Sequence, residues 1–323
     1  MRNISIKEKI LTSLNPVIKN SFSVRIDRSK ISLLAKKLKK YPIPSWDNIS
    51  QFLGNSEETI QYYFFLDSIN FCFWNIQGKE RWEVEKDGKW MHGYYAFAYA
   101  IKNAFIANKQ LFNASYLSGI TFDDFSKIFK GRGELLLLKE RREIIQENFK
   151  ILQEKHNGKA LNLVTEAEND ADKLTGLIIQ DFPAFGDYSE FKGQKVYFLK
   201  RAQLFVSDIN YAFQGKNAGY FKNMENLTIF ADYKLPQLLE SEGVLVYSEK
   251  LKNKLANYEL IEKDSEEEIE IRANTIYVCE MLLRELNRLG RNLTSNNLDW
   301  VLWVLSQENK PLLPYHRTIT TNY

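Results

Sequence analysis

The sequence contains few of the residues that cross-link a chain or bind a metal. Its 323 residues include 2 cysteines, Cys72 and Cys279, and 3 histidines. The cysteines lie far apart in separate apolar stretches, so they cannot build a disulfide framework or a zinc cluster. No histidine takes part in an HxxxH or HxE pattern, and we therefore expect neither a catalytic metal nor a cofactor.

Long apolar runs and a strong charge bias are also missing. No stretch of about 18 apolar residues could span a membrane, and the start, MRNISIKEKILTSLNP, lacks the apolar core of a signal peptide. The net charge is +3, and the basic run KKLKK at 36–40 suits the solvated end of a helix better than a nucleic-acid track. We expect a soluble, cytoplasmic protein with no membrane and no stable nucleic-acid partner, and the sequence leaves its oligomeric state open.

Signature loops of several enzyme classes are absent as well. The sequence contains no GxSxG, which argues against a serine triad of the hydrolase type. It contains no GxxxxGK[ST] and no GxGxxG after a strand, which argues against nucleoside triphosphates and dinucleotides. Chemistry by carboxylate and lysine side chains remains.

Helical periodicity and aromatic residues dominate what is present. Aromatic residues make up 14% of the chain, which favours packing surfaces first and stacking on a planar ligand second. Apolar spacings of three and four predict helices over 28–40, 45–54, 56–74, 93–109, 121–129, 135–156, 160–182, 200–213, 226–233, 235–243, 275–290 and 296–308. The expected fold class is mainly α, as a single domain over 1–323.

A few segments have a strand-like pattern. RWEVEKDGKWM at 81–91 predicts a hairpin that turns at Asp87-Gly88. The segments QKVYFL and EEIEIRA are candidates for short strands or for extended leads into helices. The GRG sequence at 131–133 is read as a plain turn, with phosphate binding through its backbone N–H groups as the alternative.

Polar groups occupy the middle of the apolar helix predicted over 56–74. On a 3.6-residue period Asp67, Asn70, Phe71 and Trp74 share one face, and apolar residues cover the rest. The helix should therefore be buried, and Asp67 with it. A buried carboxylate needs a partner, and no cation stands one turn away, so the partner comes from elsewhere in the fold or from a ligand.

Two further segments hold candidates for chemistry. On the helix predicted over 200–213, Lys200, Gln203, Ser207 and Tyr211 lie opposite the apolar stripe. They form either a solvated face or a binding face, and the second gains weight because Gln203 and Ser207 are short and uncharged where a solvated face usually has Glu and Lys. Asp232 precedes a helix that begins near Leu235, so it is either a helix cap or a carboxylate that faces a developing cation.

Five segments, taken together, resemble a known family. They are LDSINFCFW at 66–74, FLKRAQLFVSDI at 198–209, TIFADYKLPQ at 228–237, EIEIRA at 268–273 and YHRT at 315–318. They are similar to the queuosine salvage proteins, the queuosine 5′-phosphate N-glycosylases, from about NSFSVRI to the last residue. The resemblance implies an all-helical domain related to helix-hairpin-helix DNA glycosylases, and hydrolysis of queuosine 5′-phosphate to release queuine for tRNA modification.

The resemblance also implies roles for individual residues. Asp232 would stabilise the oxocarbenium-like sugar or orient water, and Lys200 would assist beside it or neutralise the substrate phosphate. Asp67 would accept hydrogen bonds from the guanine-like edge of the base. The remaining expected substrate contacts are Phe71, Trp74 and Tyr233 for stacking, Gln203 and Asp208 for the base or its cyclopentenediol arm, and Arg201, His316 and Arg317 for the phosphate.

One region departs from the family pattern, and two other functions stay open. The segment NIQGKERWEVEKDGKWMHGYYAF keeps the pattern only loosely, so we assign it no site residues. A DNA or RNA base glycosylase would share the fold class, but the small net charge does not favour duplex binding. A non-catalytic helical binding protein would use the same polar groups only to cap and solvate its helices.

Overall fold

The structure is a computed structural model that describes residues 4–46, 50–308 and 314–323. The described chain is mainly helical. Its α-helices are α1 (Ile6–Asn20), α2 (Arg28–Leu38), α3 (Ser56–Ser68), α4 (Gly93–Ala107), α5 (Ala114–Ser118), α6 (Phe122–Ile128), α7 (Leu138–His156), α8 (Ala160–Glu166), α9 (Ala171–Asp181), α10 (Lys200–Ala212), α11 (Lys234–Ser241), α12 (Glu249–Ala256), α13 (Glu266–Arg288) and α14 (Ser295–Glu308). The prediction of a mainly α fold is confirmed.

The strands form short antiparallel pairs. They are β1 (Val24–Ile26) with β6 (Leu245–Tyr247), β2 (Glu83–Lys86) with β3 (Lys89–His92), and β4 (Tyr188–Phe191) with β5 (Gln194–Tyr197). The pair β2–β3 is the hairpin predicted from the sequence. It turns through Asp87 and Gly88, whose φ angles of 51° and 74° suit the tight turn of a two-residue hairpin.

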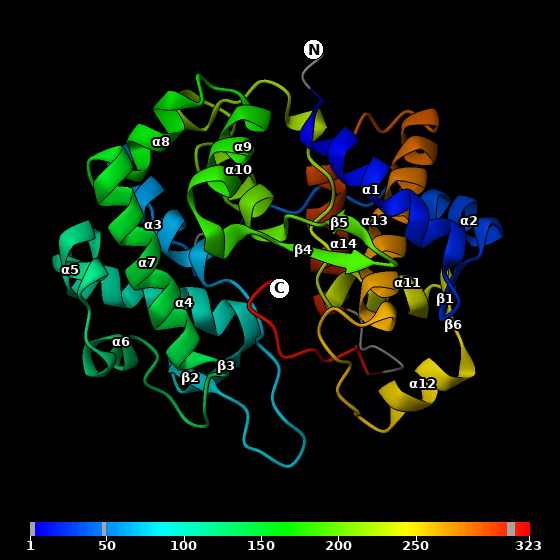
Figure 1. The fold of residues 1–323 in the computed structure, drawn as a ribbon, viewed down its shortest axis with the longest axis horizontal. Helices are drawn as coiled ribbons and strands as arrows, with labels where there is room; N and C mark the ends of the chain where they lie inside the picture. Colours follow the sequence, from blue (N-terminus) through cyan, green and yellow to red (C-terminus); the bar gives the residue numbers. More distant parts are fainter. Residues whose placement is uncertain (1–3, 47–49, 309–313) are drawn as a thin grey trace.

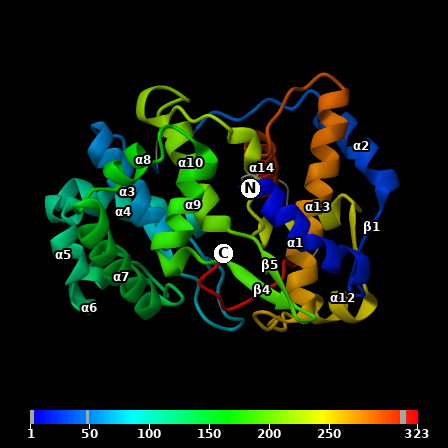
Figure 2. The same cartoon turned by 45° about the horizontal axis from the view of Figure 1, so that its top comes forward.

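Buried apolar side chains form two clusters. The aromatic core gathers α3, α4, α6, α7, α9 and the body of α10, on the left of Figure 1. The aliphatic core surrounds α13 with α1, α2, α11 and α14, on the right and centre of Figure 1. Figure 2 shows the same division after a 45° turn, with α10 and α14 lying between the two sides. Each core buries the apolar faces of amphipathic helices, which supplies most of the helical stability.

Helix α3 is buried over almost its whole length, as the sequence predicted. Asn55 caps its start by accepting from the Glu58 N–H, and every residue from Thr59 to Ser68 is buried. The predicted extension to residue 74 is wrong, because α3 ends at Ser68. Beyond Ser68, the Arg141 guanidinium donates hydrogen bonds to the backbone carbonyls of Ile69, Phe71 and Cys72. Asp67, Asn70, Phe71 and Trp74 therefore do not share a helical face.

Three other sequence predictions are corrected. Of the helix predicted over 45–54, residues 47–49 lie outside the described residues, and 50–53 are not helical. Residues 227–233 are not helical, because side chains supply their backbone partners: Gln203 accepts from the Thr228 N–H and Asp299 from the Phe230 N–H. The segment EEIEIRA is not a strand but the first turns of α13, which Ser265 caps.

The GRG segment is engaged by the hairpin. The N–H of Arg132 donates to the Glu83 carbonyl and the Glu83 N–H donates back to the Arg132 carbonyl, both at 3.0 Å. A Cβ at Gly131 or Gly133 would collide with the backbone of the hairpin. These glycines therefore allow a close backbone approach, which supports the plain structural reading of the segment.

Candidate active site

The two strongest catalytic candidates lie where the cores meet. Lys200 follows Leu199 of the aliphatic core and precedes Ala202 of the aromatic core. Asp232 lies between Ala231 of the aliphatic core and Tyr233 of the aromatic core. A cavity of about 230 Å³ opens at this junction, and both candidates line it. We call this place the seam.

Asp232 combines the two roles that the sequence left open. Its Oδ1 accepts from the N–H groups of Lys234 and Leu235, at 2.8 and 3.0 Å, and so caps α11. Both hydrogen bonds go to the same oxygen, and Asp232 also lines the cavity. Burial raises the pKa of Asp232 above its ordinary value, although the Leu235 N–H and the Lys200 charge oppose that rise.

Lys200 is buried at the first turn of α10. Its backbone N–H donates to Asp187 Oδ2 at 3.0 Å, and its Nζ donates to the Asn70 carbonyl at 2.9 Å. Burial lowers the pKa of Lys200 to about 8, while the charges of Asp232 and Asp67 act in the opposite direction. A lysine with this pKa can change its protonation state close to neutral pH.

Asp67 lies behind the cavity wall. Its Oδ1 accepts from Asn70 Nδ2 at 3.2 Å, and its Oδ2 has no hydrogen-bond partner among the described residues. Burial raises the pKa of Asp67 to about 7, against the Asn70 hydrogen bond and the charges of Lys200 and Arg201. The hydrogen-bond partner of Asp67 is therefore local, and only the charges of Lys200 and Arg201 reach it from elsewhere in the fold. Asn70 also accepts from Lys200 and lines the cavity.

Two further carboxyl groups line the cavity. Asp208, on α10, has a buried Oδ2 that finds no hydrogen-bond partner in the part of the chain that the structure describes. Asp299, on α14, accepts from the Phe230 N–H at 2.7 Å and so holds the segment that leads to Asp232. Burial raises the pKa of both groups well above the ordinary value, and the Asp67 charge raises that of Asp208 further. Each is therefore more readily protonated than an exposed carboxyl group.

Aromatic rings form one wall of the cavity. The Trp46 ring stacks on Tyr211, with centroids 4.9 Å apart and an interplanar angle of 7°, and Trp300 stacks on Trp303 at 5.6 Å. On another side Tyr233 lies 4.8 Å from Tyr315. Such rings suit a planar ligand with apolar faces.

Three basic side chains line the cavity where it opens to solvent. Arg81 and His92 are exposed and Lys234 is partly buried, and all three line the cavity. Burial lowers the pKa of His92 and of Lys234, and the Arg81 charge lowers both further. The cavity is therefore basic at its mouth and lined by carboxyl groups inside.

The sequence reasoning missed much of this lining. Asn296, Asp299, Trp300, Trp303 and Gln307 line the cavity from one face of α14. Their spacing of three, four, seven and eleven residues was readable in the sequence, where a polar and aromatic stripe on an apolar helix is the signal. Arg81 and His92 come from the hairpin region, which received no assignment because it departs from the family pattern, and Lys234 begins α11.

Several expected substrate contacts lie outside the cavity lining. Arg201 donates to the carbonyls of Ser68 and Ala184, and Gln203 bonds to Thr228 and to the Phe198 carbonyl. Phe71 lies under the Arg141 guanidinium, 4.2 Å from ring centroid to Cζ, and Trp74 packs in the aromatic core. The structure thus brings together Lys200, Asp208, Asp232 and Tyr233, but not these four.

The two expected phosphate contacts of the tail also lie apart from the lining. His316 is buried against Tyr323, with Nε2 3.2 Å from the phenol oxygen, and burial lowers the pKa of His316 to about 3. The Arg317 guanidinium lies over the rings of Tyr258 and Tyr315, 4.6 Å from each centroid. A neutral His316 cannot pair with a phosphate as a cation.

Within the described residues, no group of three or more His, Cys, Asp or Glu side chains could hold a metal ion. Among the described helices, none has the length and apolarity needed to cross a membrane.

The fold and the cavity define a mainly helical protein whose cavity is lined by a buried lysine, carboxyl groups and aromatic rings. The chain belongs to the queuosine salvage protein family, whose profile matches residues 50–323. A protein of Sphaerobacter thermophilus is 38% identical over 317 residues, 97% of each chain, and one of Mus musculus is 32% identical over 320 residues, 94% of this chain and 95% of its own. Both are named queuosine 5′-phosphate N-glycosylase/hydrolase.

Proposed function

We propose that this chain is a hydrolase that cleaves the N-glycosidic bond of queuosine 5′-phosphate and releases queuine for tRNA modification. The observation that carries the proposal is the shared name of relatives that match nearly the whole chain. The cavity at the seam supports it independently, because Lys200 and Asp232 line the same space as aromatic rings and further carboxyl groups. The relatives' names favour neither a DNA or RNA base glycosylase nor a non-catalytic binding protein.

In the proposed reaction water attacks C1′ of the ribose while the bond from C1′ to the base nitrogen breaks. The water oxygen becomes the new hydroxyl at C1′, and the base nitrogen keeps the bonding electrons and takes up one proton. Positive charge builds on the sugar, so a carboxylate close to C1′ stabilises the transition state. The Asp232 oxygen that does not cap α11 is our candidate for this role, either towards the cation or towards the attacking water.

Departure of the base needs its own assistance. A 7-deazapurine has no N7 to protonate, so help must reach another edge of the base. Asp208 and Asp299 are our candidates for this task because burial raises their pKa and so favours the neutral form, and a neutral carboxyl both donates and accepts hydrogen bonds. Lys200 stands beside Asp232 either as part of the chemistry or as a charge for the phosphate.

The phosphate fits best at the mouth of the cavity. Arg81 and Lys234 supply cations there, His92 can donate a hydrogen bond from its ring, and an arginine can bind a phosphate through two N–H groups. We propose this set for the phosphate in place of Arg201, His316 and Arg317, which lie outside the cavity lining.

Incubation of the purified protein with queuosine 5′-phosphate, followed by mass spectrometry for free queuine, tests the proposal. The wild type should release queuine, and Asp232→Asn should lower the rate by at least about 10³-fold. Asp170→Asn is the matched control, because Asp170 caps α9 through the Lys173 N–H as Asp232 caps α11, but it does not line the cavity. No release by the wild type, or equal loss in both variants, contradicts the proposal.

Finer statements belong to the same proposal. We propose that the helical fold is related to helix-hairpin-helix DNA glycosylases, with the Lys200 and Asp232 pair as the shared element, and that residues 1–323 act as one domain. We also propose that the substrate is the free nucleotide and not a nucleic acid, in keeping with the net charge of +3. A cytoplasmic location is proposed because Cys72 and Cys279 are both free, buried thiols.

A further inference from the structure

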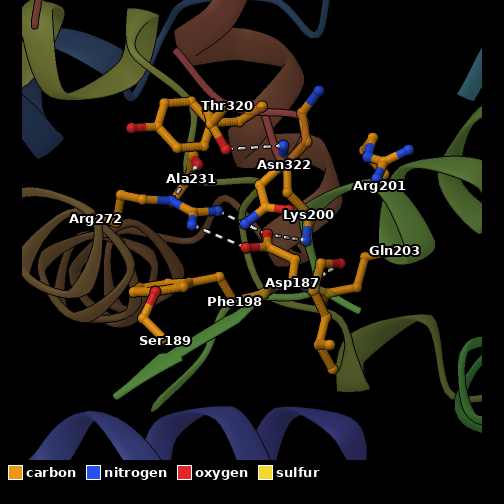
Figure 3. Close-up of polar contacts among 12 residues, drawn as sticks. Asp187, Ser189, Phe198, Lys200, Arg201, Gln203, Ala231, Arg272, Thr320 and Asn322 are labelled. Carbon is orange, nitrogen blue, oxygen red and sulfur yellow. Dashed lines mark hydrogen bonds and ion pairs between the residues drawn. The ribbon is translucent and has the colours of Figure 1, made fainter. Parts of the chain in front are cut away.

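Arg272 of α13 connects segments that are distant in the sequence. Its side chain is fully buried. Its Nη1 and Nη2 donate to the two carboxylate oxygens of Asp187, at 2.8 and 2.7 Å, and Figure 3 shows the two groups facing each other. Its Nε donates to the Ala231 carbonyl at 3.2 Å. One guanidinium thus holds Asp187 and the residue directly before Asp232.

Asp187 in turn holds the beginning of α10. Its Oδ2 accepts from the Lys200 N–H at 3.0 Å, and its backbone carbonyl accepts from the N–H groups of Phe198 and Leu199, at 3.0 and 3.1 Å. Leu199 adopts a left-handed conformation, with φ of 54°, which a branched side chain rarely takes without support. The Asp187 contacts therefore fix the point at which Lys200 enters the helix.

Two aromatic rings lie close to the Arg272 guanidinium. Its Cζ lies 4.0 Å from the centroid of Phe198 and 4.3 Å from that of Tyr323. Tyr323 lines the cavity, and its carbonyl accepts from the Cys72 N–H at 2.9 Å. The orientation of the planar guanidinium is thus determined by two rings and three hydrogen bonds, which leaves it little freedom.

Arg272 keeps its charge although it is buried. Burial lowers the pKa of Arg272, but the charges of Asp187 and Glu268 more than offset this, so the net pKa is raised. A buried ion pair is weak evidence for stability, because apolar residues of similar volume often stabilise a fold equally well. Its use is better sought in the geometry that it imposes.

We propose that the Arg272–Asp187 pair is a positioning device that sets the separation of Lys200 from Asp232. The carboxylate end fixes the backbone of Lys200, and the Nε end fixes the carbonyl that precedes Asp232. Neither member of the pair lines the cavity, so both act through the residues they hold. The kinetic consequence rests on the proposed function: a displacement of about 1 Å at a reacting group can lower a rate by about 100-fold.

Asp187→Asn tests this inference with little change of volume. An amide has a single oxygen, so it cannot accept from Arg272 and from the Lys200 N–H as the carboxylate does. We expect kcat for queuine release to fall by about 10- to 100-fold, with KM within about 3-fold of the wild type. Arg272→Lys keeps the positive charge but loses the two parallel N–H donors of the guanidinium, so it should also lower kcat.

Glu270→Gln is the matched control. Glu270 is buried on the same helix and accepts from the N–H groups of Phe22, Ser23 and Val24, none of which lines the cavity. We expect Glu270→Gln and Asp187→Asn both to lower Tm, because each changes a buried carboxylate that accepts hydrogen bonds. Glu270→Gln should nevertheless keep the wild-type kcat when both variants are assayed well below their Tm. Equal losses of kcat in the two variants, or a wild-type kcat in Asp187→Asn, overturn the inference.

Crystal structures of the wild type and Asp187→Asn give a second readout that needs no turnover. The distance from Lys200 Nζ to the Asp232 carboxylate should change by about 1 Å, and an unchanged distance overturns the inference. If the wild type releases no queuine, the proposed function fails, and this distance alone decides whether the pair positions the two side chains.

Discussion

The aromatic and aliphatic cores bury their surface in different ways. In the aromatic core Phe64 alone meets the rings of Phe149, Phe182 and Phe205, with centroids 5.4, 5.0 and 5.6 Å apart. In the aliphatic core the 23-residue helix α13 packs against α1, α2, α11 and α14 through leucine, isoleucine and valine. Aromatic rings present broad, flat surfaces, whereas interlocking aliphatic side chains pack α13 closely against its neighbouring helices.

The comparison explains why the cavity forms at the seam. The aromatic side contributes Tyr211, Tyr233 and the Asn70 carbonyl, and the aliphatic side contributes α14, with the rings of Trp300 and Trp303, and Arg272 of α13 behind the cavity. Neither core alone holds both Lys200 and Asp232 in place. A site between two differently packed regions depends on the integrity of each, and this dependence can be tested by weakening one region at a time.

The largest expected effect comes from emptying either core. Phe64→Ala should cost about 3–5 kcal/mol and Leu282→Ala about 2–5 kcal/mol of the free energy of unfolding, because both side chains are fully buried and leave cavities. Urea unfolding followed by far-UV circular dichroism and by tryptophan fluorescence measures both. If residues 1–323 form one cooperative domain, each variant lowers the midpoint of one shared transition. Two separate transitions would break the single-domain prediction.

Removing the lysine of the seam should affect rate without affecting the cores. Lys200→Met should lower kcat/KM by about 100-fold, near 2.7 kcal/mol, and should leave Tm unchanged or raised, because a buried ammonium is replaced by an apolar side chain. Lys254→Met is the control, since that lysine pairs with Glu267 away from the cavity. A loss of Tm that matches the loss of rate would place Lys200 among the structural groups.

The aromatic wall should contribute to binding more than to rate. Trp300→Leu should raise KM about 10-fold, near 1.4 kcal/mol, with kcat changed by less than about 3-fold, because stacking is present before and during the reaction. Trp90→Leu serves as control, because Trp90 lies on β3 outside the cavity lining and is 44% exposed. A change in kcat alone would contradict a stacking role for Trp300.

The smallest effect is a shift of the pH profile. Because the pKa of Lys200 is about 8, a reaction that needs its charged form should decline as pH rises through about 8. The Asp67 charge raises the pKa of Lys200, so Asp67→Asn should move this decline to lower pH, by less than about one unit. Rates of queuine release between pH 5 and 10 measure the shift, and Asp172→Asn, remote from the cavity, should leave the profile in place. A shift to higher pH would show that Asp67 does not act on Lys200.

The sequence was informative wherever local pattern decides structure. The hairpin over 83–92, the helix that carries Lys200 and the capping position of Asp232 all follow from spacing and turn chemistry, and the structure has each of them. The end of α3 was not predictable, because it depends on Arg141 arriving from α7 to take three carbonyls. Tertiary partners override local preference at such positions.

The site was only partly predictable for a related reason. Arg201 and His316 carry the right chemistry for a phosphate, but the sequence does not show that both are buried against backbone and rings. Arg81 and His92 look ordinary in the sequence, and only the packing of the hairpin region brings them to the mouth of the cavity. Charge can be read from a sequence, whereas exposure has to be read from a fold.

The elements of the two cores are spaced differently along the sequence, and this spacing affects folding during synthesis. The aromatic core is built largely from one continuous stretch, whereas the aliphatic core joins α1, α2 and β1 to β6 and α13, which leave the ribosome more than two hundred residues later. The apolar faces of α1 and α2 therefore stay uncovered while the middle of the protein is translated. We expect this nascent N-terminal segment to be the part of the molecule that depends most on chaperones.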